Sequence, residues 1–142
     1  MKKENRKKRF ATNASVDSEQ KLKISMTDTK IYAWIFLTVH EQPTFLNEVL
    51  WRADGINHAI PMLEELQNSF GWLQAQGFVR KVGKEYLLTE TGATLKKSIS
   101  HGNIFSVLDK ITEKFSQLPE IGFTPDAITE KELDAAYKLN RK

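Results

Sequence analysis

The chain has 142 residues, enough for one domain with an arm but too few for two full cores. Hydrophobic residues make up 40% and charged residues 27%, an ordinary globular composition that argues against a disordered or fibrous chain. The absence of cysteine excludes a disulfide scaffold, a thiolate metal site and a cysteine nucleophile. The longest apolar run, residues 31–37, is too short for a membrane span, and no apolar signal-peptide segment follows the charged start. We therefore expect a cytoplasmic protein without membrane contact.

The net charge of +3 is unevenly distributed along the chain. The first nine residues hold six cations against Glu4, so the remainder sums to about −2. Residues 1–26 are polar and have few bulky apolar groups, which predicts a flexible basic arm. Such an arm binds polyanions by counterion release, although a solubilising tail explains the charge equally well. The six cations are Lys2, Lys3, Arg6, Lys7, Lys8 and Arg9.

Two helices are predicted after the arm. The first begins near Thr27 or Asp28, either of which suits an N-cap. It is apolar around most of its circumference over residues 30–40 and is therefore expected to be central. Thr44 is placed to cap a second, amphipathic helix, which is expected to stop at Asp54-Gly55 because glycine suits the position after a helix end.

A third helix and a hairpin follow. Pro61 suits the first turn of a helix, and Gly77 is expected to end it. Residues 78–82 and 85–89 then alternate with period two around Gly83-Lys84, which predicts a short hairpin.

Three further helices are expected towards the C-terminus. Thr89 is placed to cap the first, and Thr129 to Glu132 fit the capping box of the last. Between them, a 3-4-3-4 apolar stripe predicts a helix that pairs two subunits or folds back onto the first helix. We favour a homodimer because two apolar surfaces in a short chain need more cover than one core gives. The stripe is Ile104, Leu108, Ile111, Phe115 and Leu118.

The order of helix, helix, helix, hairpin and helix is that of a winged helix-turn-helix. Residues 73–79, Leu-Gln-Ala-Gln-Gly-Phe-Val, and 86–92, Tyr-Leu-Leu-Thr-Glu-Thr-Gly, are similar to the helix end, wing and exit of MarR-like and PadR-like regulators. The resemblance covers about half the chain. We expect a mainly α fold with a small β-hairpin: a winged-helix domain over residues 27–100 and C-terminal helices, a possible dimerisation element, over residues 101–142.

The resemblance implies that the third helix enters the major groove of double-stranded DNA and that the hairpin reaches phosphate. The sequence agrees only in part, because no lysine or arginine occurs between Ala53 and Val79, where Asp54, Glu64 and Glu65 are acidic. Amide side chains can still pair with adenine edges, and cations on the wing can approach phosphate. The amide side chains and the hairpin cations can equally be explained as ordinary solvent-exposed surface. The expected DNA contacts are Gln67, Asn68, Gln74, Arg80, Lys81 and Lys84.

Trp72 suggests an alternative function. Its angular position falls away from the apolar stripe of the third helix, beside Glu65 and Gln76. A partly exposed tryptophan among acidic and amide groups is typical of a protein contact, unless the wing or the C-terminal helices cover it. A winged helix used as a protein-interaction module is therefore the alternative to a DNA-binding transcription regulator.

No enzymatic chemistry is indicated. His40, His58 and His101 lie in separate segments without metal-ligand spacing. No glycine-rich phosphate loop, nucleophile elbow or metalloprotease motif occurs. We expect no metal, no cofactor and no catalytic site.

Overall fold

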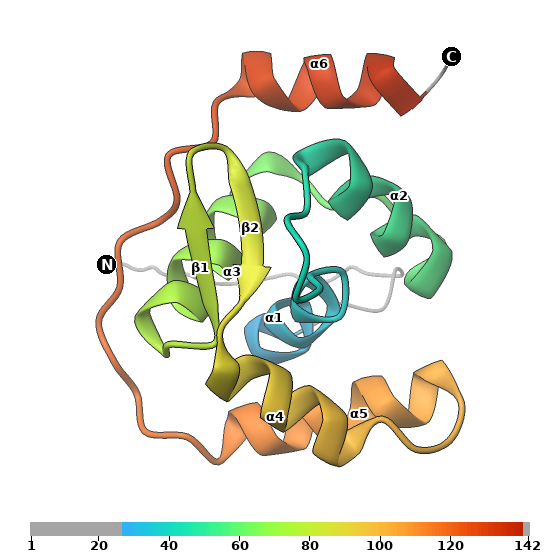
Figure 1. Ribbon diagram of the computed structural model, residues 1–142, viewed down its shortest axis with the longest axis vertical. Coiled ribbons are helices and arrows are strands. Elements are labelled where there is room, and N and C mark those ends of the chain that lie inside the picture. The colour runs from blue at the N-terminus through green and yellow to red at the C-terminus, as the bar shows by residue number, and fades with distance from the viewer. Residues whose placement is uncertain (1–26, 141–142) are drawn as a thin grey trace, which may run out of the picture.

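The computed structural model describes residues 27–140, which fold mainly as helices with one small antiparallel hairpin (Figure 1). This confirms the predicted class of secondary structure. The predicted basic arm lies outside the described residues. The elements are α1 Asp28–Phe36, α2 Leu46–Asn57, α3 Leu63–Ala75, β1 Val79–Val82, β2 Glu85–Leu88, α4 Glu90–Ile99, α5 Ile104–Ser116 and α6 Glu130–Asn140.

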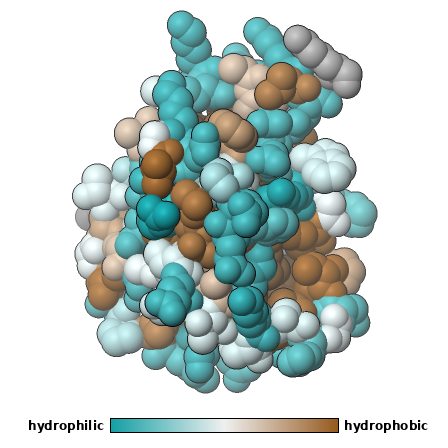
Figure 2. All heavy atoms as spheres, in the orientation of Figure 1, coloured by the Kyte–Doolittle hydropathy of each residue, from teal (hydrophilic) through white to brown (hydrophobic). Residues whose placement is uncertain are grey.

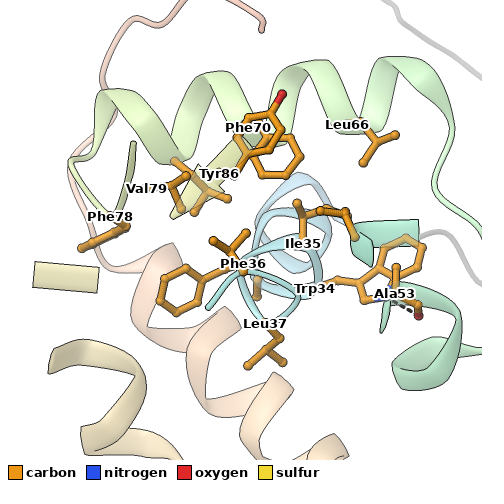
Figure 3. Close-up of a cluster of buried hydrophobic side chains, with 14 of the residues drawn as sticks. Trp34, Ile35, Phe36, Leu37, Ala53, Leu66, Phe70, Phe78, Val79 and Tyr86 are labelled. Carbon is orange, nitrogen blue, oxygen red and sulfur yellow. Dashed lines mark hydrogen bonds between the residues drawn. The ribbon is translucent and has the colours of Figure 1, made fainter. Parts of the chain in front are cut away.

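Helix α1 lies at the centre of the fold, as its apolar circumference predicts. Residues 33–37 are buried, and the helix packs against α3 on one side and α5 on another (Figure 3). The indole N–H of Trp34 donates to the carbonyl of Ala53, 2.9 Å away, and ties α1 to α2. The helix ends at Phe36, short of the predicted end at His40.

Helix α2 differs from prediction at both ends. Thr44 does not cap it; Thr44 forms an isolated β-bridge with Tyr86, and the Glu48 carboxylate accepts from the N–H of Phe45 instead. The helix continues through Gly55 and ends where His58 takes a left-handed conformation, with φ 53°. Gly55 is an ordinary helical position, so it does not act as the stop signal.

Helix α3 starts at Leu63, later than expected. Pro61, which was predicted in its first turn, lies two residues before it, and Met62 is the N-cap. The helix ends at Ala75, and Gly77 follows with φ 82°, in agreement with its predicted role as the residue that stops the helix. Phe70 on α3 stacks on Tyr86 of β2 with ring centroids 3.8 Å apart, which joins the helix to the hairpin (Figure 3).

The hairpin forms where it was predicted, around Gly83-Lys84, with Val79 opposite Leu88 and Val82 opposite Glu85. Gly83 in the turn has φ 63°, a conformation that suits glycine. Thr89 then caps α4 by accepting from the N–H of Gly92, as predicted.

The apolar stripe of α5 faces the interior of the same chain. Leu108, Ile111 and Phe115 are buried, and the Phe115 ring lies 5.4 Å from the ring of Phe36 on α1. Only Ile104 is exposed and Leu118 is half-buried. Because α1 covers the stripe, it is not available as a dimer seam in this conformation. Of the two predicted arrangements, the structure has the one in which the helix folds back onto the first helix.

After α5 the chain crosses the molecule without regular structure over residues 117–129, which we call the strap. Figure 1 shows the strap running along one edge of the molecule, past α3 and the hairpin, to α6 at the opposite end from α5. The predicted capping box begins α6, with the N–H of Thr129 donating to the carboxylate of Glu132. Helix α6 packs on α2, where the Asn140 side-chain amide donates to the carbonyl of Asn47. The buried residues of 27–100 and of 101–142 belong to one core cluster.

Candidate nucleic-acid interface

The structure brings four of the predicted DNA-contacting residues onto one face. Gln67 and Gln74 lie on α3, Lys81 lies on β1, and Lys84 lies in the hairpin turn. We call these four side chains the α3–hairpin face. The strap or the first turn of α6 contacts each of them.

Asp126 of the strap is the centre of these contacts. Its carboxylate accepts from Lys81 Nζ at 2.7 Å, from the Gln74 side-chain amide at 2.8 Å and from the Tyr86 hydroxyl at 3.1 Å. The Asp126 side chain is only 2% exposed. Burial raises the pKa of Tyr86, and the nearby Asp126 charge adds to this, so the phenol stays a hydrogen-bond donor. A cation, an amide and a phenol thus hold one buried carboxylate.

Two further features fix the strap against α3. The Gln67 side-chain amide donates to the carbonyl of Ile128, and the N–H of Asp126 donates to the carbonyl of Gln67, both at 2.8 Å. Gly71 lies under the strap: a Cβ on Gly71 would overlap the carbonyl oxygen of Thr124 and would lie 2.9 Å from Pro125 Cα. Glycine inside a helix costs about 1 kcal/mol relative to alanine. At this position it permits the strap backbone to touch the helix.

Helix α6 adds a second acidic contact. Glu132 lies 3.0 Å from Lys84 Nζ. The pKa of Glu132 is lowered, chiefly by the hydrogen bond from the backbone of Thr129 and next by Lys84. The Lys84 side chain is 81% exposed, so this ion pair contributes little to stability. It nevertheless places a second carboxylate against a lysine of the hairpin.

The two other predicted DNA contacts lie on the same elements. Asn68 is half-buried on α3, and Arg80 is exposed on β1.

The net charge of the described residues is unfavourable for binding DNA. Residues 27–140 contain fifteen acidic and eleven basic side chains, a net charge of −4. The positive total of the chain therefore comes from the residues outside this part.

The alternative interface built on Trp72 is not exposed. Trp72 is 8% exposed, because Tyr32 of α1 stacks on it with ring centroids 4.7 Å apart and Phe115 of α5 lies 4.8 Å away. The indole is therefore covered by α5, one of the C-terminal helices named in the sequence analysis, and also by α1. Glu65 accepts from the N–H of Met62 and so caps α3, and Gln76 is the half-buried C-cap residue. These three residues do not form a contact surface.

Three further features of the described residues concern exposed hydrophobic side chains, metal ligands and helix length. Figure 2 shows that hydrophilic residues cover most of this face, with hydrophobic ones in separate clusters. Within residues 27–140, no group of three or more acidic or histidine side chains could hold a metal ion. No helix of the described part is long and apolar enough to cross a membrane.

Comparison with known proteins adds no further assignment. No family model matches the chain, and neither a curated protein nor a solved structure matches it. The site therefore has to be interpreted from its own geometry.

Sequence reasoning did not single out Asp126 and Glu132 as partners of the α3–hairpin face. Glu132 appeared only as part of a capping box, and Asp126 belongs to a stretch without periodicity. The one local signal for the covered face was Gly71, an unexplained glycine in the middle of a helix.

Proposed function

We propose that this chain is a winged-helix protein that binds double-stranded DNA through the α3–hairpin face and acts as a transcription regulator. The order of α1, the Thr44–Tyr86 bridge, α2, α3 and the hairpin supports the winged-helix assignment. In this arrangement α3 is the recognition helix and the hairpin is the wing.

The observation that carries the proposal is the chemistry of the α3–hairpin face. Two amide side chains and two lysines line it and already bind the Asp126 carboxylate and the Ile128 carbonyl of the strap and the Glu132 carboxylate of α6. Amides are suited to base edges, and lysines to phosphate oxygens. Arg80 adds an exposed cation on the same hairpin. An extended anionic ligand is the class of partner that this set of groups binds.

The test is fluorescence anisotropy of the full chain on a mixed-sequence duplex across a salt series. The variant Arg80→Gln/Lys81→Gln/Lys84→Gln should weaken binding and lower the slope of log K against log salt by about 2 to 3, because each lost phosphate contact removes about 0.9 from the slope. The matched control, Lys97→Gln/Lys110→Gln/Lys114→Gln on α4 and α5, changes the net charge equally and should leave the slope nearly unchanged. Equal slopes for the two variants would overturn the proposal.

A second candidate is a protein-interaction module that does not bind DNA specifically. The closed α3–hairpin face and the net charge of −4 over residues 27–140 favour it. In that case the full chain binds duplex DNA only through residues 1–26, and a chain starting at Met26 shows no binding. Truncation at Met26 therefore separates the two functions.

A further inference from the structure

We infer that the strap and α6 form an intrasteric cover that competes with DNA for the α3–hairpin face. This inference rests on the proposed function, since it concerns the regulation of the same site. The carboxylates of Asp126 and Glu132 occupy the positions on Lys81 and Lys84 that phosphate oxygens would take.

The cover and DNA cannot occupy the face together. The strap backbone lies on Gly71 at the middle of α3, so no space is left there for a base edge or a sugar. Both amide side chains of the face are committed: Gln67 donates to Ile128 and Gln74 donates to Asp126. Lys81 Nζ is bound at 2.7 Å. DNA binding by this face therefore requires the strap to leave it.

The construction of the strap is compatible with release. Residues 117–129 contain no helix or strand, and the hydrogen bonds that hold the strap to α3 and the hairpin are gathered at Asp126 and Ile128. Its buried apolar anchor is Ile128, with Phe123 half-buried against Tyr32. Segments with few apolar contacts open at lower free energy than the core. Release also separates the two lysines from the carboxylates of Asp126 and Glu132, so it changes the charge of the face as well as its shape.

The cost of opening reduces the apparent affinity for DNA. A protein whose competent form is populated to a fraction f binds with an apparent Kd of Kd/f. If the closed form is favoured about tenfold, removing the cover tightens binding about tenfold. A variant that releases the strap should therefore gain affinity without any new contact to DNA.

The first variant releases the strap without changing charge. Gly71→Ala places a Cβ where the carbonyl oxygen of Thr124 lies, while alanine favours helix α3 itself. The matched control is Gly55→Ala in α2, where a Cβ would meet nothing within 4 Å. Anisotropy of the full chain on the mixed-sequence duplex should show binding about tenfold tighter for Gly71→Ala, and within about twofold of wild type for Gly55→Ala.

The second variant releases the strap through charge. Asp126→Asn/Glu132→Gln removes both carboxylates and should again tighten binding about tenfold beyond its control. The control, Asp109→Asn/Glu113→Gln on α5, changes the net charge by the same amount away from the face. Because both variants gain the same charge, general attraction to DNA affects both equally.

Amide hydrogen exchange provides a readout that does not depend on affinity. Adding duplex DNA to the wild-type chain should increase exchange over residues 117–129, and Gly71→Ala should do so without DNA while α1 and α5 stay protected. If Gly71→Ala and Asp126→Asn/Glu132→Gln bind no more tightly than their controls, while the triple hairpin variant still weakens binding, the cover is overturned and DNA binding stands. If the triple hairpin variant has no effect either, the proposed function itself fails.

Discussion

Asp126 provides the most direct test of how the strap is held. Asp126→Ala removes the acceptor for Lys81, Gln74 and Tyr86 at once. Removing one member of a buried ion pair costs about 3–5 kcal/mol, and a buried polar group left without a partner costs about 1–3 kcal/mol. Lys81 is 26% exposed and regains water, which lowers the total. Because the strap can leave while the rest of the chain stays folded, the loss in the free energy of unfolding is limited to the free energy that holds the strap closed, about 1.4 kcal/mol for a tenfold preference.

The assay is thermal unfolding followed by far-UV circular dichroism. With an unfolding entropy of about 2.1 cal/mol/K per residue over residues 27–140, a loss of about 1.4 kcal/mol lowers Tm by about 6 °C. The control is Asp109→Ala, whose side chain is 75% exposed and lies 4.0 Å from Lys30. It should change the free energy of unfolding by less than about 0.5 kcal/mol. If Asp126→Ala is equally mild, Asp126 does not anchor the strap, and the reasoning from its contacts is refuted.

Two further predictions concern buried positions away from the strap. Gly92→Ala should lower the free energy of unfolding by more than about 2 kcal/mol, because a Cβ there would overlap the backbone carbonyl of Phe78. The higher helix propensity of alanine does not offset this clash. Urea unfolding checks the prediction, and a variant as stable as the wild type would contradict it. Burial, and next the charge of Arg52, lower the pKa of Lys96 to about 8 from 10.5. Between pH 8 and about 9.5 the unfolded chain therefore binds more protons than the folded chain, so stability should rise with pH. Urea midpoints across that range should show the rise, and Lys96→Met should remove it.

Local features of the sequence predicted most of the fold. Thr89 and Thr129 begin helices because their side chains bind the free N–H groups of the first turn, and Gly77 and Gly83 mark turns because of their positive φ. The predicted end of α2 at Asp54-Gly55 was wrong, because a glycine permits the left-handed conformation that ends a helix but does not require it. His58 takes that conformation instead.

Contacts between distant segments account for what was missed. The angular argument for Trp72 considered only the stripe of its own helix, whereas Tyr32 and Phe115 from two other helices cover its opposite side. The strap has no periodicity, and the hydrogen bond from Gln74 to Asp126 spans 52 residues. No local pattern could have paired them. The residues of the α3–hairpin face were predictable, but their occupation by this chain was not.

The position of the strap also orders the events of folding. The contacts of the last part of the chain close long loops: 45 residues separate Lys81 from Asp126, and 93 separate Asn47 from Asn140. Loop closure of this length has an entropic cost that the local helices and the hairpin do not bear. The central helices and the hairpin of residues 27–116 are therefore expected to form before the strap docks. Docking of the strap is then the step in which α3 becomes covered.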